Sequence, residues 1–254
     1  MTVLCIETST SVCSAAICKD GVPVKQCISL EGGNHARLLP RYIEELLAFA
    51  REQGLAIEAV ALSEGPGSYT GLRIGTSTAK GLCYGLDVPL IPIPTLDILC
   101  EAAKTAVSLQ PSAILIPMID ARRMEVYTEG PSDKVPSDKV PSDKGTSDKG
   151  DRVNRAKAVV VEGEESLLTP SLLGEGREGA SYYYFGDGAA KCQSVLTSPN
   201  WHFVPGIVPE AQYMGAIVER KKLKGERNKE LAYYEPYYLK EFIAAQSHVK
   251  GLKS

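Results

Sequence analysis

One stretch, residues 63–86 (SEGPGSYTGLRIGTSTAKGLCYGL), has the Gly-x-Gly spacing before a helix that a nucleotide-binding loop would need. An apolar run ends just before it, a Gly-Pro-Gly turn follows, and Ser68 or Thr70 can cap a helix whose first N–H groups point outward. Thr70 stands where a dinucleotide-binding loop has its third glycine, and Lys80 lacks the neighbours that define a P-loop. The stretch therefore predicts a strand, a tight turn and a helix, and matches neither of these nucleotide-binding loops.

The helix of this stretch has small residues four apart, at Gly71, Gly75 and Ala79. An interior glycine costs a helix about 1 kcal/mol relative to alanine, so a close approach by another backbone should offset that cost. Two interpretations are open, namely packing on the chain's own sheet and contact with a second protein. Arg73 lies in the first turn, where the helix dipole disfavours a cation, so we expect it to have an anionic partner.

Other residues that commonly do chemistry form no recognisable motif. His35, His202 and His248 lie far apart, none has a second histidine at helical spacing, and no G-x-S-x-G sequence occurs. We therefore expect no catalytic residue and no metal ligand. A hydrolase site assembled in space from distant residues remains an open alternative.

Composition bounds the kind of protein and its partners. The 254 residues are 44% hydrophobic, enough for a sizeable core, and the formal net charge is −3. No global basic field favours RNA or an anionic membrane, so any RNA should be held mainly by a partner. Seven cysteines without a C-x-x-C pair predict reduced thiols and a cytoplasmic location. No apolar run approaches the roughly 20 residues of a membrane span.

Hydrophobic periodicity predicts a first α/β domain over residues 1–107. Three closely spaced strands should form an antiparallel meander, and later strands should join a mixed sheet through helical crossovers. Thr95 is the expected N-cap of the last helix. In order, the expected elements are strands 3–6, 14–18 and 22–28, helix 38–51, strand 59–62, the central helix, strand 90–93 and helix 95–107.

Residues 108–254 predict a second α/β domain. A five-residue unit ending in Ser-Asp-Lys repeats four times between Gly130 and Lys149, and its polar, proline-containing composition predicts a flexible insertion over residues 130–155. Helix 211–223 could pack on either domain. The expected elements are strands 113–118, 124–128, 158–161, 182–185 and 203–204, with helices 164–168, 189–196 and 211–223.

Two α/β domains that repeat one plan resemble the actin, Hsp70 and sugar-kinase superfamily, in which mixed sheets flanked by helices clamp ATP in a cleft. The resemblance implies a glycine-containing hairpin that begins with Asp in each domain. Here the hairpins begin at Glu7 (ETSTS) and Asp120 (DARR), and neither contains glycine. We therefore expect degenerate nucleotide hairpins and no phosphoryl transfer by this chain.

Five motifs resemble the TsaB (YeaZ) family: ETST, NHARLLP, GPGSYTGLRIGTSTAKGL, IDARRMEVY and PYYLK. The resemblance implies a non-catalytic scaffold in the threonylcarbamoyladenosine modification of tRNA. Such a subunit dimerises with a TsaD-like catalytic homologue and is joined by a TsaE-like ATPase. It meets tRNA only through that complex, and it is expected to form a homodimer when alone.

The resemblance also places the dimerisation surface on the first helices of the N-terminal domain, which favours partner contact over internal packing for the small-residue stripe. The positions that this assigns to the partner interface are Gly71, Leu72, Arg73, Gly75, Thr78 and Ala79. Gly75→Leu is accordingly expected to abolish partner binding and to leave the fold intact.

Two alternatives remain, a glycoprotease-like peptidase and a nucleotide-binding ATPase of the actin-like superfamily. The ATPase alternative includes nucleotide binding without hydrolysis, in which ATP or ADP occupies a composite site that the partner completes. No other cofactor is expected. The residues that would contact the nucleotide are Thr8 and Ser9 in the first hairpin and the turn Gly186, Asp187 and Gly188.

Overall fold

The computed structural model describes residues 1–108, 113–129, 157–160, 180–223 and 231–239. The expected repeat insertion at 130–155 and the expected helix 164–168 lie outside these residues. In the described part of the chain, no helix is long and apolar enough to cross a membrane. All seven cysteines are free thiols, and all but Cys100 are buried.

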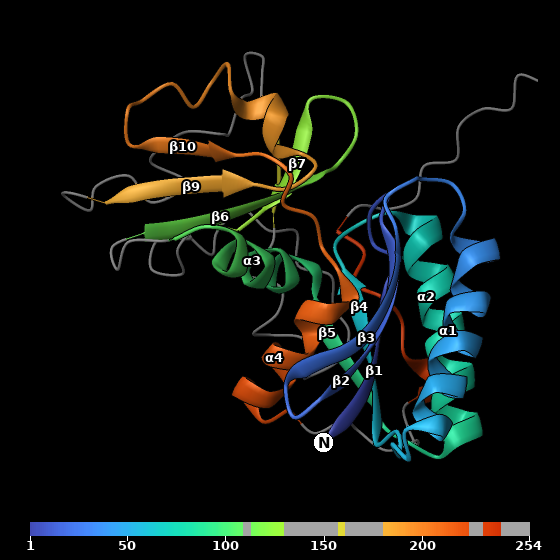
Figure 1. Cartoon of the computed structure of the whole chain (residues 1–254). Helices are drawn as coiled ribbons and strands as arrows, with labels where there is room; N and C mark the ends of the chain where they lie inside the picture. Colours follow the sequence, from blue (N-terminus) through green and yellow to red (C-terminus); the bar gives the residue numbers. More distant parts are fainter. Residues whose placement is uncertain (109–112, 130–156, 161–179, 224–230, 240–254) are drawn as a thin grey trace, which may run out of the picture.

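The first sheet has five strands in the order β3-β2-β1-β4-β5 (Figure 1). β1, β2 and β3 pair antiparallel, whereas β1, β4 and β5 run parallel. The mixed sheet and its meander confirm the predicted arrangement, because tight turns join the first strands and helices join the others. The strands are β1 (Thr2–Glu7), β2 (Cys13–Lys19), β3 (Val22–Ser29), β4 (Ala59–Gly65) and β5 (Leu90–Pro94).

Two helices, α1 (His35–Glu52) and α2 (Tyr69–Leu86), cover one face of this sheet (Figure 1). The buried residues of α1 recur at spacings of three and four, which is the stripe that a helix must turn toward a core. Pro40 lies inside α1. The Ser68 hydroxyl accepts a hydrogen bond from the Gly71 N–H at 3.3 Å, which confirms Ser68 as the cap of α2. The buried residues of α1 are Leu39, Ile43, Leu46 and Ala50.

The second sheet has the order β10-β9-β6-β7-β8, with β10, β9 and β6 parallel and β6, β7 and β8 antiparallel. The stacked rings of Tyr182 and Trp201, 4.6 Å apart, lie in its core. Where a helix was predicted over residues 189–196, the chain forms only a 3-10 turn, η2 (Ala189–Cys192). The strands are β6 (Ala113–Asp120), β7 (Glu125–Thr128), β8 (Lys157–Val160), β9 (Ser181–Phe185) and β10 (Trp201–Val204).

Helix α3 (Thr95–Ala106) lies between the two sheets (Figure 1). Ile98 packs in the core of the first sheet, and Leu99 packs in a cluster with residues of the second. The Thr95 hydroxyl has no hydrogen-bond partner in the described structure, and the N-cap position belongs to Pro94. The expected Thr95 cap is therefore wrong, because β5 runs directly into the helix.

The predicted helix 211–223 consists of a 3-10 turn, η3 (Ala211–Tyr213), followed by α4 (Met214–Lys221). It packs on the face of the first sheet opposite to α1 and α2 (Figure 1). Arg220 donates to both carboxylate oxygens of Glu101 in α3, at 3.0 and 2.8 Å. A segment from the C-terminal half thus completes the core of the N-terminal sheet.

The described C-terminal segment, residues 231–239, also returns to the first sheet. It begins with the 3-10 turn η4 (Leu231–Tyr233) and passes along α2, where Lys80 donates to the carbonyl of Ala232 at 2.8 Å. Further along, the N–H of Tyr237 donates to the carbonyl of Glu64 at 2.7 Å, next to the Gly-Pro-Gly turn. Residues 231–239 therefore pack against the N-terminal domain at the start of α2.

The position of α4 leads to a stability prediction. Ile217 is fully buried against the first sheet. Ile217→Ala should lower the free energy of unfolding by about 2–4 kcal/mol, because it removes buried methyl groups and leaves a cavity. Ile28→Ala, on the edge strand β3 at 38% exposure, is the matched control. Equal losses in chemical denaturation would contradict the packing of α4 in this core.

Candidate partner interface

The inner face of α2 lies against the first hairpin. A Cβ added at Gly71 would overlap the carbonyl oxygen of Thr8, and one at Gly75 would overlap the Thr8 hydroxyl and lie 3.1 Å from Leu62. The Thr8 hydroxyl donates to the carbonyl of Gly71 at 2.8 Å. The close backbone approach that the glycines predict is confirmed, and the approaching backbone is the chain's own hairpin.

This packing corrects part of the expected interface. Gly71, Leu72, Gly75 and Ala79 are buried within the chain, so they are not available to a partner at its surface. Two of the expected interface residues lie elsewhere on α2, where Arg73 is exposed and Thr78 half-buried. For those two, partner contact stays a prediction.

The outer face of α2 was missed by the assignment to the glycine stripe. Ser77 and Gly81 are exposed, a Cβ added at Gly81 would meet open space, and Tyr84 is 85% exposed. This side of α2 therefore presents two small residues and one large ring to solvent. The spacing of these three residues, four and then three apart, is the signal that could have identified this face from the sequence.

A groove of ≈ 540 Å³ runs between α1 and α2 on this outer side. Its floor is mainly apolar, from Ile43, Leu47 and Leu82, and Glu44 and Arg51 flank it. The remaining lining residues are Pro40, Ala48 and Thr78. An apolar groove with charged edges is the form that accepts an amphipathic helix of another protein.

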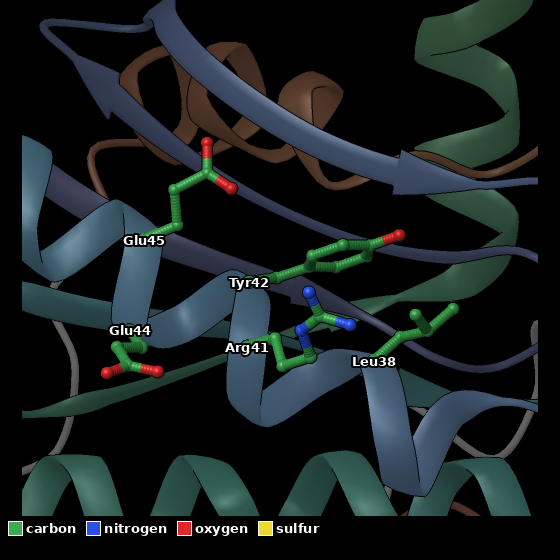
Figure 2. A pocket seen from close by; sticks show the side chains of 5 residues that line it. All are labelled: Leu38, Arg41, Tyr42, Glu44 and Glu45. Atoms are coloured by element: carbon green, nitrogen blue, oxygen red, sulfur yellow. The ribbon is translucent and has the colours of Figure 1, made fainter.

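A second hollow, of ≈ 460 Å³, is formed by α1 alone (Figure 2). Glu44 and Glu45 point to opposite sides of the helix, and Arg41 lies beside Tyr42. Burial raises the pKa of the Tyr42 hydroxyl, and the charges of Arg37 and Arg41 offset part of that shift. Glu45 forms an ion pair with Lys25 of β3 at 2.9 Å. Together with Leu38, these residues form a polar border beside the apolar groove.

Arg73 occupies the start of the outer face. It donates to the Tyr69 hydroxyl at 2.8 Å, and its guanidinium lies 5.5 Å from the centre of the same ring. The ring of Tyr238, from the C-terminal segment, lies 5.0 Å from that of Tyr69. The expected anionic partner is therefore not found among the described residues, and a neutral phenol takes the hydrogen bond.

The first hairpin is filled by its own carboxylate. Ser9 donates to one oxygen of Glu7 from both its N–H and its hydroxyl, each at 2.5 Å, while the second oxygen has no hydrogen-bond partner in the described structure. Burial raises the pKa of Glu7 to about 7, and the negative charge of Asp187 contributes to the shift. Thr8 and Ser9 are fully buried, so the donors that nucleotide binding would use are already engaged.

The Gly186-Asp187-Gly188 turn lies against the end of β6. Gly186 has a φ of +108°, and a Cβ there would overlap the carbonyl of Met118. The Asp187 carboxylate accepts a hydrogen bond from the Asp120 N–H at 3.0 Å. The structure thus brings this turn close to both hairpins, since the carboxylate also acts on Glu7. Its glycines serve packing, and nucleotide contact stays a prediction.

Two of the three histidines are described. His35 begins α1, with its Nε2 3.1 Å from the carbonyl oxygen of Val12, and His202 lies on β10 with its ring 5.0 Å from that of Tyr183. His248 lies outside the described residues. Within the described ranges, no group of three His, Cys, Asp or Glu side chains could hold a metal ion.

Comparison with known proteins places the chain in a family. The family model for TsaD, tRNA N6-adenosine threonylcarbamoyltransferase, matches residues 30–239. The chain belongs to this family. A curated relative, the tRNA threonylcarbamoyladenosine biosynthesis protein TsaB of Haemophilus influenzae, is 36% identical over half of this chain. The chain spans about half the length of the curated TsaB relatives it matches, 52% in that case.

Two further proteins refine the comparison. The tRNA N6-adenosine threonylcarbamoyltransferase of Salinibacter ruber is 36% identical over 38% of this chain and 34% of its own length. YeaZ from Pseudomonas aeruginosa has the same fold, with a TM-score of 0.64 over 94% of this chain and 99% of that one, at 24% identity. The resemblance to TsaB (YeaZ) proteins, predicted from the motifs, is confirmed by these relatives. The mixed α/β fold of the actin-like type, predicted from the repeated plan of strands and helices, is confirmed as well.

The two faces of α2 predict opposite effects of the same substitution. Gly71→Ala should lower the free energy of unfolding by about 1–3 kcal/mol, because the methyl group meets the backbone of Thr8. Gly81→Ala, in open space, should raise it by up to about 1 kcal/mol through helix propensity alone. Chemical denaturation of both variants measures the difference, and a tolerated Gly71→Ala would contradict the internal packing.

Glu7 predicts a pH dependence of stability. Its pKa is raised from 4.5 to about 7 in the folded chain, so burying its charge costs about 3 kcal/mol above pH 7, and that cost disappears as pH falls toward 4.5. Glu7→Gln should therefore stabilise the chain more at pH 8 than at pH 5. The exposed Glu44→Gln serves as control. A gain that does not change with pH would contradict a buried, titrating Glu7.

Proposed function

We propose that this chain is a non-catalytic subunit in the biosynthesis of threonylcarbamoyladenosine in tRNA, and that it acts by pairing with a TsaD-like catalytic homologue. The observation that carries the proposal is the accessible face of α1 and α2 in a chain of this family. Its relatives are named as proteins of that pathway or as the transferase itself. The proposal includes a cytoplasmic location.

The partner surface is the outer α1–α2 face, defined by Ala48, Ser77, Gly81, Tyr84 and the apolar groove between the helices. The small side chains of Ala48, Ser77 and Gly81 permit close approach of another helix, while the apolar groove supplies area that docking would remove from water. A homologous transferase is a natural occupant, because it would present related helices in a related fold. A second copy of this chain competes for the same face when the partner is absent.

The first hairpin supports the non-catalytic role. Phosphoryl transfer requires backbone donors that are free to hold phosphate, and a metal ion to neutralise charge. Here the donors of Ser9 are bound to Glu7, and the second hairpin carries Arg122 and Arg123, both exposed and both at positive φ. The chain would therefore support catalysis by its partner. A TsaE-like ATPase would join the pair, and tRNA would be contacted through the complex.

The test uses size exclusion with light scattering on the chain alone and on an equimolar mixture with the TsaD-like protein of the same organism. The expected result is a homodimer that converts to a one-to-one complex. Ala48→Arg and Gly81→Arg should weaken the complex at least tenfold, because each places a long cation on the proposed contact surface. Gln193→Arg, exposed on the second lobe, adds the same side chain as a control.

Two outcomes would contradict the proposal. One is a wild-type chain that ignores the transferase while both proteins are folded. The other is a purified chain that by itself hydrolyses ATP or a peptide at a steady rate, which would favour one of the enzyme alternatives. Loss of binding in Gln193→Arg as well would move the interface away from α1 and α2.

A further inference from the structure

We propose that Arg73 anchors a carboxylate side chain on the helix that a TsaD-like partner lays against α2, and that it thereby favours this partner over a second copy of the chain. The proposal rests on the proposed function and names a specificity-determining residue within that interface. The residues that carry it are Tyr69, Arg73 and Tyr238, which we term the Arg73 cluster.

The cluster holds the guanidinium in place before any partner arrives. Tyr69 accepts its hydrogen bond and lies under the cation, and the ring of Tyr238 packs against that of Tyr69. Tyr238 is positioned in turn by its neighbour, because the N–H of Tyr237 is bonded to the carbonyl of Glu64. A long, exposed arginine usually loses side-chain entropy on binding, and this support reduces that loss.

The cluster leaves most of the binding capacity of Arg73 unused. A guanidinium has five N–H donors in a planar fork that matches a carboxylate. Among the described residues, the hydrogen bond of Arg73 goes to the Tyr69 hydroxyl, and no carboxylate lies within ion-pair distance. Glu235, on the C-terminal segment, acts on Arg73 only through its more distant charge.

Charge along α2 identifies the complementary group. Arg73 and Lys80 are the only charged residues of α2, and Lys80 is bonded to the carbonyl of Ala232. Arg73 lies in the second turn of α2, where an external carboxylate would pair with an exposed cation that has no ion-pair partner among the described residues. The α2 of a second copy offers only the same two cations, and the acid that lines the groove, Glu44, lies on α1. Where α2 packs against α2, only a different protein can place an acid at Arg73.

Position connects the cluster with the proposed interface. Arg73, Ser77, Gly81 and Tyr84 follow one another along the outer face of α2, about one helical turn apart. A helix that lies along this face therefore reaches Arg73 at the N-terminal end of α2. The occupant to which the structure points is an acidic side chain on such a helix.

The experiment measures the dissociation constant of the wild-type complex and of Arg73→Gln, Arg73→Lys and Tyr238→Ala at low and high salt. Arg73→Gln should weaken the complex tenfold or more at low salt, and less at high salt, because an exposed ion pair is screened. Arg73→Lys should recover part of the loss, since it keeps the charge without the fork. Tyr238→Ala should weaken binding by a smaller factor. Arg123→Gln, exposed on the second lobe, is the matched control.

A double-mutant cycle identifies the carboxylate. When the acids on the partner's paired helix are changed one at a time to the amide, one of them should lose its effect in the Arg73→Gln background. Self-association of Arg73→Gln, measured by sedimentation, should be unchanged or tighter.

Three results would overturn the proposal. The first is a normal wild-type complex that Arg73→Gln does not weaken, which leaves the proposed function intact. The second is self-association that falls as much as the complex does, because a second copy would then supply the carboxylate. The third is an Arg73→Gln variant that binds the partner protein normally but forms a complex with weaker tRNA binding. Arg73 would then contact a phosphate of the tRNA. Failure of the wild-type chain to bind the partner refutes the proposed function instead.

Discussion

The contact between α2 and the first hairpin determines how the rest of the molecule is arranged. Thr8 donates to the carbonyl of Gly71, Gly75 leaves room for the Thr8 side chain, and the N–H of Ser68 donates to the carbonyl of Ser9 at 2.6 Å. Because two backbones approach this closely, the hairpin has no space for a phosphate beside α2. The same contact turns the opposite side of α2 toward solvent.

An enclosed hairpin and an exposed helix face are thus two consequences of one packing arrangement. Glu7 occupies the donors of Ser9, at the cost of a buried carboxyl whose pKa rises to about 7. A buried carboxyl of this kind persists only where the surrounding fold stabilises it. The outer face of α1 and α2 offers small residues, an apolar groove and one supported cation, which are the features of a docking surface.

The second half of the chain contributes to this surface although it forms another sheet. Helix α4 closes the far face of the first sheet, and the C-terminal segment runs along α2 until Tyr238 reaches Tyr69. Residues far apart in sequence therefore set the position of Arg73. A partner that binds α1 and α2 would meet a surface to which two segments distant in the sequence contribute.

The sequence by itself determined the type of most strands and helices, the mixed first sheet and the family, because hydrophobic periodicity and long specific motifs are local properties. It also predicted a close approach at Gly71 and Gly75. It could not decide what approaches them, since a glycine stripe reads the same whether a hairpin or a partner lies against it. The place of α4 and the meeting of Tyr238 with Tyr69 were decided only by tertiary structure, because each depends on contacts between residues distant in the chain. The burial of Glu7 was decided in the same way, since the packing of α2 on the hairpin encloses it.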